Sequence, residues 1–407
     1  MKIVTLLFLA LFLNADSLQD AINRAKPYST IKLSSGIYRG NFTINKPLNI
    51  IGDSDQTILD GKKRGSVITI KSKDVTIKNL TILGSGHRKE NFDSAITAKN
   101  SDNLTIQNCT IKDALYGIYL MMSNHTKILN NFISSKDEKI PLRGDGLKLW
   151  YSNFALIKGN TFYKVRDINL ARSNNSLIED NNFSFSRFTT YIELSINSII
   201  KNNRYNHNEV SIMLMGTKNI KIISNDILSS SGVTGIGIVL KGGKNIIVKD
   251  NTIKYNAKAI YIDNKPNEKG ILRRIDHNLI TYNLEALHFH VCIRNNEIKN
   301  NIIDNNLDDV LRNLREYKTK ENDIEYNFWG QYRGFDKNGD GIGDTPYIKK
   351  VFLDKLWSYN QKIKFFYASV VIELANFLCE IAPFSEPLIL LEDKKPLKIR
   401  PVWRKNE

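Results

Sequence analysis

The sequence predicts an all-β solenoid, a right-handed parallel β-helix with an N-terminal cap and a short C-terminal helical tail. Nine times, an apolar residue is followed three positions later by Asn and five positions later by another apolar residue. These repeats are about two dozen residues apart, a period that is typical of solenoids. Their Asn residues are Asn131, Asn160, Asn181, Asn203, Asn225, Asn251, Asn278, Asn301 and Asn327. We expect each Asn to lie at a turn, where Asn tolerates the left-handed conformation and hydrogen-bonds the neighbouring backbone.

A second repeat gives the register of the strands. Eight triplets have an aliphatic or aromatic residue at both ends and a variable residue in the middle, at 118–120, 147–149, 168–170, 192–194, 212–214, 238–240, 260–262 and 287–289. Because successive side chains of a strand point to opposite faces, the end residues should fill the core and the middle residues should face outward. This period of two excludes a helical repeat. Successive coils should lie about 4.8 Å apart.

The start of the chain predicts export. Lys2 is followed by an apolar run at residues 3–13 that is too short to cross a bilayer, and the small Ala15 comes soon after it. We therefore expect residues 1–15 to be a signal peptide. A buried first strand or an uncleaved anchor are the alternatives.

The rest of the chain divides by composition. Residues 17–22 suit a short helix that covers the open end of the core. Loops at 84–94 and 134–145 are long enough to protrude, and insertions in solenoids tend to lie on one face, often the binding face. Apolar residues return at helical spacing between 356 and 379. The predicted parts are a cap at 16–45, the β-helix at 46–329, an Asp/Gly-rich loop at 330–347 and a helical and extended tail at 348–407.

The formal net charge of +16 favours acidic partners, namely anionic lipid headgroups, acidic glycans or an acidic protein. A generally Lys-rich composition is the alternative explanation. Nucleic acid is not expected to bind, because the chain lacks clustered basic runs and an interleaved aromatic platform. Three cysteines are too few and too scattered for a disulfide framework.

The closing segment at residues 327–347, NFWGQYRGFDKNGDGIGDTPY, resembles the end of the β-helix in NosD proteins. Further matches to that family are at 143–152, 235–241, 286–290 and 306–310, whereas residues 167–172 depart from it. The resemblance implies a periplasmic accessory protein that is not an enzyme. It implies as partners an ABC transporter of permease and ATPase subunits, a copper chaperone, and nitrous oxide reductase, whose copper–sulfide centre the system assembles. This chain has no Walker motif, so we expect it to bind no nucleotide and the ATPase to hydrolyse ATP.

Soft donors suited to copper occur at outward positions. His288, His290 and Cys292 alternate along one strand and should face outward together. Tyr261 and Asp263 should lie one coil before them, within reach of a shared Cu(I). A partner-docking or solvated face without metal is the alternative.

Met213 and Met215 should project outward together from an earlier coil. Met215 and His290 are three coils apart, roughly 14 Å, so they cannot hold the same ion. They could be successive copper stations or parts of a docking surface for a copper donor.

The Asp/Gly-rich loop follows the spacing of a calcium-binding loop. Asp336, Asn338, Asp340, Ile342 and Asp344 stand at positions 1, 3, 5, 7 and 9, with Gly at 6, although the bidentate Glu of position 12 is missing. We expect a structural Ca²⁺ site there. A turn held by Asx hydrogen bonds is the alternative.

The tail carries aromatic residues on a single expected helix, Phe365, Phe366 and Phe377. They would either cap the open core or pack on the transporter's permease at the membrane surface.

Other function classes fit less well. The outward charged residues Lys148, Glu193, Lys241 and Asp263 are spread over five coils, so we expect no compact acid/base cluster and no catalytic residue. A polysaccharide lyase or epimerase acting on acidic glycans is the alternative function, and a passive adhesin is a third.

Overall fold

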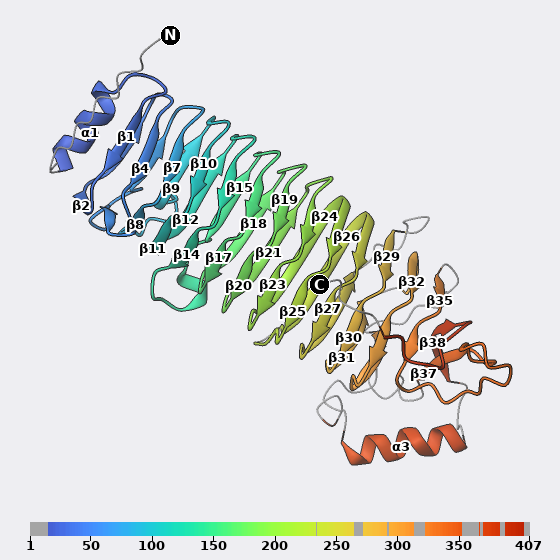
Figure 1. Ribbon diagram of the computed structural model, residues 1–407. Helices are drawn as coiled ribbons and strands as arrows, with labels where there is room; N and C mark the ends of the chain where they lie inside the picture. The colour runs from blue at the N-terminus through green and yellow to red at the C-terminus, as the bar shows by residue number, and fades with distance from the viewer. Residues whose placement is uncertain are drawn as a thin grey trace, which may run out of the picture. The chain divides into compact units, whose positions relative to one another are not determined.

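The computed structural model describes residues 15–232, 234–263, 272–290, 293–312, 322–351, 366, 369–382 and 387–402. The chain divides into two compact units between residues 211 and 212. Each unit is a parallel β-helix in which short strands stack coil upon coil (Figure 1). The predicted all-β solenoid is therefore confirmed. Residues 1–14 of the expected signal peptide lie outside the described part of the chain.

The first unit begins with α1 (Ala15–Arg24) and contains one 3-10 turn (Ile140–Leu142). Its strands are β1 (Thr30–Leu33), β2 (Gly36–Arg39), β3 (Phe42–Ile44), β4 (Asn49–Gly52), β5 (Thr57–Asp60), β6 (Ile68–Ile70), β7 (Thr76–Lys78), β8 (Thr81–Leu83), β9 (Ser94–Lys99), β10 (Thr105–Gln107), β11 (Thr110–Ala114), β12 (Tyr116–Met121), β13 (Lys127–Leu129), β14 (Phe132–Ser135), β15 (Leu147–Trp150), β16 (Leu156–Lys158), β17 (Thr161–Tyr163), β18 (Asp167–Ala171), β19 (Leu177–Glu179), β20 (Asn182–Ser184), β21 (Phe188–Glu193), β22 (Ile199–Lys201) and β23 (Arg204–Asn206).

The second unit contains most of β24 (Val210–Ile223) and ends with α3 (Val370–Ile381) and β38 (Leu388–Asp393). Between them lie β25 (Asp226–Leu228), β26 (Ile236–Lys249), β27 (Thr252–Lys254), β28 (Lys258–Asp263), β29 (Arg273–Asp276), β30 (Leu279–Thr281), β31 (Glu285–Phe289), β32 (Asn296–Lys299), β33 (Ile302–Asp304), β34 (Asp308–Arg312), β35 (Asp323–Glu325), β36 (Phe328–Trp329) and β37 (Tyr347–Val351).

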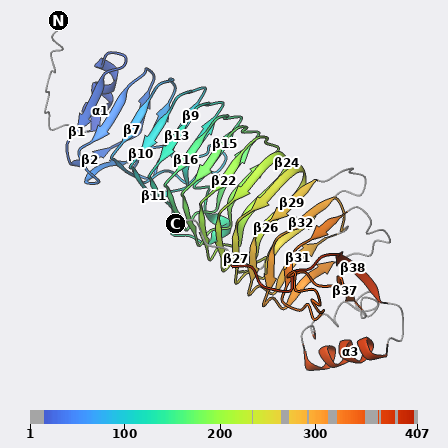
Figure 2. The ribbon, with the colours of Figure 1, turned by 45° about the vertical axis from the view of Figure 1, so that its right-hand side comes forward.

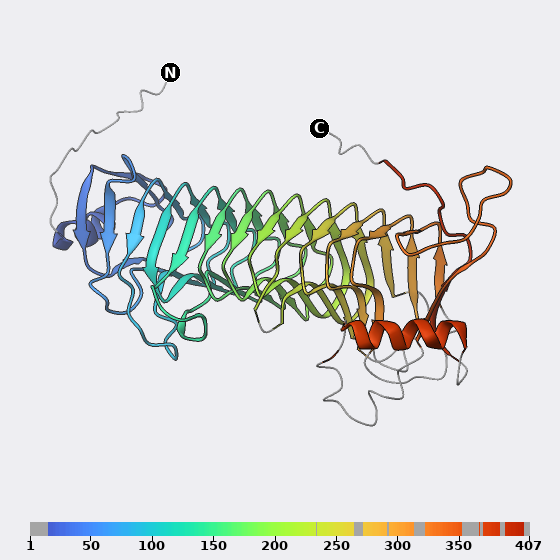
Figure 3. The same cartoon turned by 90° about the horizontal axis from the view of Figure 1, so that it is seen from below.

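Three columns of parallel strands build each unit, as Figures 2 and 3 show from two directions. The column that carries the predicted triplets, here the first column, runs through β9, β12, β15, β18 and β21 in the first unit. In the second unit it runs through β26, β28, β31 and β34. Register is kept between most neighbouring coils, so equivalent side chains form rows along each unit.

The end residues of the triplets fill the core, as predicted, with one exception. Ile118, Leu149 and Leu287 are typical and are fully buried. Leu194 is 47% exposed, so its predicted core position was wrong. The pairing of β18 with β21 contains a register shift, which sets Ile192 opposite Leu170 and moves Leu194 into the following turn.

The recurrent Asn residues are buried and form hydrogen-bonded ladders inside each unit. The backbone N and the Nδ2 of Asn131 both donate to Oδ1 of Asn160, at 2.9 Å each. Asn160 donates in the same way to Asn181. The predicted backbone hydrogen bonding is confirmed, because Nδ2 of Asn160 also donates to the carbonyl of Ile128 at 2.8 Å. The predicted left-handed geometry was wrong, since the residue before each Asn has the positive φ, as at Asn130 with 52°.

The N-terminal end of the first unit is covered by α1, where the sequence predicts a helix over residues 17–22. Leu18 and Ile22 are fully buried. The side chain of Gln19 accepts from the backbone N of Thr43 at 2.8 Å and donates to its carbonyl at 3.1 Å, which pairs the helix with β3. Strands β1 to β3 already lie within the residues 16–45 that the sequence analysis assigns to the cap.

The C-terminal end of the second unit is closed by two tail strands. Strand β37 pairs with β38 in antiparallel orientation. Asp393 of β38 is fully buried, and its Oδ2 accepts from the backbone N and Nδ2 of Asn327 at 3.1 and 2.9 Å and from Nε1 of Trp329 at 2.9 Å. A carboxylate from the tail thus takes the next place in the Asn ladder. Among the described residues, no helix is long and apolar enough to cross a membrane.

Candidate functional site

His288 is one of several middle side chains of the first column that are buried, like Tyr119, Asn169 and Val239. It lies in the middle of β31, between the fully buried Leu287 and Phe289, and yet it is only 3% exposed. Neighbouring coils cover it: the ring of Tyr261 stacks on the imidazole with centroids 5.0 Å apart, and Leu311 is its register partner on the other side. The outward position was predicted from the triplet pattern, whereas its burial was not.

The two ring nitrogens of His288 have different surroundings. Nδ1 shares a 2.5 Å hydrogen bond with Oε2 of Glu285, whose charge is also balanced by Lys258 Nζ at 3.7 Å. Nε2 is buried and has no hydrogen-bond partner in the described structure. A buried polar atom without a partner costs free energy. An imidazole held by a carboxylate through one nitrogen, with the other left open, has the arrangement of a metal-binding histidine.

The other members of the predicted copper set are only partly gathered. His290 follows on the same chain, and its ring centroid lies 6.0 Å from that of Tyr261. Asp263 ends β28 and raises the pKa of Tyr261 after the larger effect of burial. Cys292 lies outside the described residues. No three His, Cys, Asp or Glu side chains gather to hold a metal ion within the part of the chain that the structure describes.

The predicted methionine pair is separate from the histidines. Met213 and Met215 lie on β24, and both are partly exposed. The coils of Val239 and Tyr261 come between them and His288. The structure therefore does not bring the two predicted donor sets together.

The candidate calcium loop is exposed, and its side-chain oxygens accept from its own backbone. Asp336 accepts from the backbone N of Gly339 at 2.8 Å and of Gly341 at 2.9 Å. Asp340 accepts from Ile342 at 2.8 Å, and Asp344 accepts from Lys337 at 2.7 Å. Oδ1 of Asn338 accepts from the backbone N of Asp340 at 3.1 Å. These are the Asx turns of the alternative interpretation, and they leave further lone pairs of the carboxylates open.

Helix α3 exposes apolar side chains. Its first turn is capped by Ser369, whose side chain accepts from the backbone N of Ile372. Phe377 of this helix is 55% exposed, and Phe366, which precedes the helix, is 57% exposed. The other exposed apolar residues of α3 are Val370, Val371, Leu374, Leu378 and Ile381. Phe365 lies outside the described residues.

The first unit contains a compact cluster of ionisable groups that the sequence analysis did not expect. Asp145 is buried, and its Oδ1 accepts from Nε and Nη2 of Arg166 at 3.0 and 2.7 Å. Asp167 pairs with both Arg166 and Arg187. Burial, and then the nearby charge of Asp167, raises the pKa of Asp145. The spacing of Asp145 and Arg166, which lie one coil apart, is the sequence signal that could have predicted this cluster. Because Asp145 ends the protruding loop 134–145, the cluster anchors that loop.

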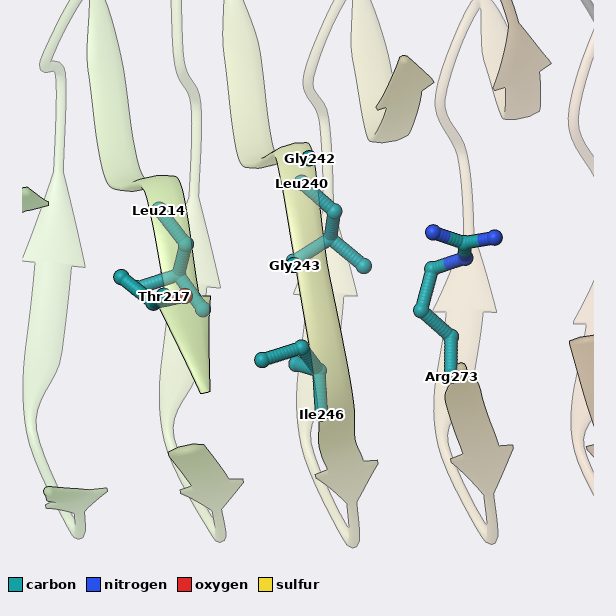
Figure 4. Close-up of a pocket in the computed structure, with 7 residues that line it drawn as sticks. All are labelled: Leu214, Thr217, Leu240, Gly242, Gly243, Ile246 and Arg273. Atoms are coloured by element: carbon teal, nitrogen blue, oxygen red, sulfur yellow. The ribbon is translucent and has the colours of Figure 1, made fainter. Parts of the chain in front are cut away.

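A narrow space in the second unit is lined on one side by a buried arginine, Arg273 (Figure 4). Arg273 is 2% exposed, and its Nε donates to Oδ1 of Asn296 at 2.8 Å. The space between the lining side chains is too small for a water molecule, so it is not a ligand site. The lining residues are Leu214, Thr217, Leu240, Gly242, Gly243, Ile246 and Arg273.

Comparison with known proteins gives a family match over most of the chain. A family model described as periplasmic copper-binding protein (NosD) matches residues 33–140 and 133–334. A probable ABC transporter binding protein NosD of Pseudomonas aeruginosa is 25% identical over 399 residues, covering 89% of each chain. Its counterpart from Stutzerimonas stutzeri is 22% identical over 402 residues, covering 90% of this chain and 88% of that one.

Solved structures share the fold. A periplasmic alginate epimerase matches with a TM-score of 0.57 and 14% identity over 77% of this chain and 82% of that one. A mannuronic acid-specific polysaccharide family 6 lyase from human gut microbiota matches with a TM-score of 0.55 and 14% identity, over 78% and 86%. At this identity the likeness supports the β-helix and carries no activity with it.

Proposed function

The chain belongs to the NosD family of periplasmic copper-binding proteins, and from this premise we propose that it handles copper for the assembly of the copper–sulfide centre of nitrous oxide reductase. In this proposal it is an exported accessory protein of an ABC transporter and has no catalytic residue. Copper is its cargo, received from a copper chaperone and passed on towards the enzyme.

The buried, open Nε2 of His288 is the observation that carries the proposal. Imidazole suits copper, and a site that is formed before the ion arrives explains why a polar nitrogen is left without a hydrogen bond. His290 would supply a second nitrogen, and Cys292 and Asp263 remain the predicted further ligands.

Neighbouring side chains prepare this imidazole for an ion. Glu285 fixes the ring orientation through Nδ1 and makes Nε2 the available donor. The stacked ring of Tyr261 keeps water away from the ring face. A Cu(I) ion bound there would be shielded on the side of β28.

Met213 and Met215 are proposed as a separate Cu(I)-binding site with thioether donors. Their coil is three steps from that of His288, on the order of 14 Å by strand spacing. Thioethers favour Cu(I) over the harder divalent ions.

The tail is proposed to hold the chain to the transporter. The exposed apolar side chains of α3, Phe377 among them, and the exposed Phe366 before the helix suit contact with the permease subunit. The names of the two relatives, which are probable ABC transporter binding proteins, support this partner.

The copper site is tested by replacing His288 and His290 with Ala. We expect the affinity for Cu(I), measured by competition with a chromophoric chelator, to fall by about tenfold or more. The matched control is His207→Ala, because His207 is an exposed histidine of the first unit that stacks on Phe185. Unchanged Cu(I) affinity in the double variant would reject the site.

The maturation role is tested in a strain that lacks this gene. Nitrous oxide reductase purified from that strain should be folded and exported but should lack the copper–sulfide centre, as measured by copper content, sulfide content and activity. The wild-type gene and His207→Ala should restore the centre, and the double histidine variant should not. A fully loaded enzyme from the deletion strain would overturn the proposed function.

A further inference from the structure

Large side chains occupy one turn on four consecutive coils of the first unit. The turn follows the first-column strand of each coil, and its equivalent residues are Met122, Tyr151, Arg172 and Leu194. Backbone hydrogen bonds of about equal length link the coils here: Met122 N donates to Trp150 O at 2.9 Å, and Arg172 N donates to Glu193 O at 2.9 Å. These four residues therefore form one row, which we call the turn row.

All four residues have the left-handed backbone conformation, with φ between 48° and 52°. That conformation is unfavourable for residues with a large side chain and is usually occupied by Gly, Asn or Asp. The same turn elsewhere in the chain follows this rule. It has Asn100 in the preceding coil of the first unit, with φ 53°, and Gly242 in the second unit, with φ 57°. A Cβ placed on Gly242 would meet open space, so this position faces solvent.

Three of the four side chains of the turn row are apolar or aromatic, and the fourth is Arg172. Met122, Tyr151 and Leu194 are 46%, 43% and 47% exposed. Three further large side chains beside the row are 40% exposed or more, namely Trp150, Phe154 and Ile196. Exposed apolar surface of this density marks an interaction site in soluble proteins.

Stacking along the coils does not account for this composition. At another turn, Phe185 and His207 are also left-handed, and their rings stack with centroids 5.3 Å apart. Met122 and Leu194 have no ring that could stack. Tyr151 and Arg172 contact each other along the coils, so the strain at Met122 and Leu194 is the part that ring contacts do not explain. Backbone strain of this kind is typical of functional surfaces.

We propose that the turn row docks a folded protein that presents a carboxylate within an apolar patch. Resting on the function proposed above, this protein is the client, nitrous oxide reductase before its copper centre is complete. Trp, Tyr and Arg are the residue types that dominate the energy of protein interfaces, and Trp150, Tyr151 and Arg172 meet here. The guanidinium of Arg172 lies 5.7 Å from the centroid of the Tyr151 ring, which holds the cation ready for a carboxylate.

The composition disfavours other occupants. A membrane surface is recognised by several cations together, whereas the row holds a single one, Arg172. A glycan stacks on planar side chains, which Trp150 and Tyr151 supply but Met122 and Leu194, at the two ends of the row, do not. Three coil steps make the row only about 14 Å long. The contact is therefore small, as is typical of a partner that binds transiently.

The test replaces the row with the residue found in the preceding coil. In the full-length triple variant Met122→Asn, Tyr151→Asn and Leu194→Asn, we expect an unchanged or higher melting temperature, because the strained residues are gone. Binding to nitrous oxide reductase purified from the deletion strain, measured by surface plasmon resonance, should weaken by about tenfold or more. The matched control is Tyr28→Asn, because Tyr28 is also left-handed, with φ 65°, and is 66% exposed, but lies outside the row.

A second variant tests the charge. Arg172→Glu should weaken binding more at low salt than at high salt, because a carboxylate opposite it would be repelled. Wild-type affinity in the triple variant, or wild-type binding to anionic vesicles instead of to the enzyme, would overturn the proposal. If the triple variant restores the copper centre as well as the wild type does, the docking surface fails while the maturation role stands. A loaded enzyme in the deletion strain would instead remove the maturation role itself.

Discussion

Asp309 shows how one buried side chain makes the stability of this protein depend on pH. It lies in β34, is 1% exposed, and accepts from the hydroxyl of Tyr347 at 3.3 Å. Burial raises the pKa of Asp309 to about 6, although Lys349 and Tyr347 act in the opposite direction. The folded chain therefore binds a proton more tightly than the unfolded chain, whose Asp has a pKa of about 4.

The sign of the pH dependence follows from this difference. Between about pH 4 and pH 6 the folded chain holds more protons than the unfolded one, so the free energy of unfolding falls as the pH rises. Two pKa units correspond to about 3 kcal/mol, fully present below pH 4 and lost above pH 6. We expect Asp309→Asn to remove this loss and to raise the melting temperature at pH 7.5 relative to the wild type, but not at pH 4.

The control is Asp250→Asn, at an exposed turn position of the same unit, which should follow the wild type at both pH values. A wild-type melting curve that shifts with pH in the same way as that of Asp309→Asn would contradict the assignment.

At the residue scale, periodicity in the sequence was enough to predict which side chains face inward. It could not predict the burial of His288, because Tyr261 and Leu311 come from neighbouring coils, 27 and 23 positions away. It also placed the left-handed conformation one residue too late. In the ladder the Asn side chain needs an inward direction, so the preceding residue makes the turn.

At the scale of elements, the loop Asp336–Asp344 is the part whose chemistry the sequence predicts most directly. Asp336, Asp340 and Asp344 each accept a hydrogen bond from a backbone N of the same short loop. Strand β38 continues into residues that hold this loop, since Lys398 N donates to Gly341 O and Gly343 N donates to Pro396 O. An ion bound here would therefore also fasten the tail.

We predict that Ca²⁺ binds this loop and raises the melting temperature by a few degrees, because an ion that binds only the folded chain stabilises it. Asp340→Asn keeps an acceptor for the backbone of Ile342 but removes a charge, so it should reduce the calorimetric heat and the gain in melting temperature. Asp226→Asn, outside the loop, is the control. If Ca²⁺ gives the wild-type protein neither calorimetric heat nor a higher melting temperature, the loop binds no Ca²⁺ and is held by Asx turns alone.

Element boundaries were less predictable than element types. The helix expected from residue 356 to 379 is observed as α3 from Val370 to Ile381, and residues 352–365 lie outside the described part. The displaced triplet at Leu194 arises from a register shift between coils, which no local pattern signals. Asp393 of β38 lies 66 positions after Asn327, to which it is hydrogen-bonded. The repeat of about two dozen residues could not predict a contact over that sequence distance.

For the molecule as a whole, the tail closes the Asn ladder and is proposed to dock the permease, and a single deletion would confuse these two roles. Removing residues 356–407 takes away β38, which leaves the backbone N and Nδ2 of Asn327 and Nε1 of Trp329 without their shared acceptor. Buried donors without partners cost about 1–3 kcal/mol each, so we expect this truncated protein to melt at a much lower temperature than the wild type.

Substituting exposed residues of α3 keeps β38 in place. Leu374→Ser with Phe377→Ser should therefore leave the melting temperature within a few degrees of the wild type and should reduce co-purification of the permease. If the substituted chain still co-purifies with the permease, α3 is not the docking element, because the tail strands alone then suffice for the contact. If the truncated chain melts like the wild type, the acceptor role of Asp393 is not what closes the ladder.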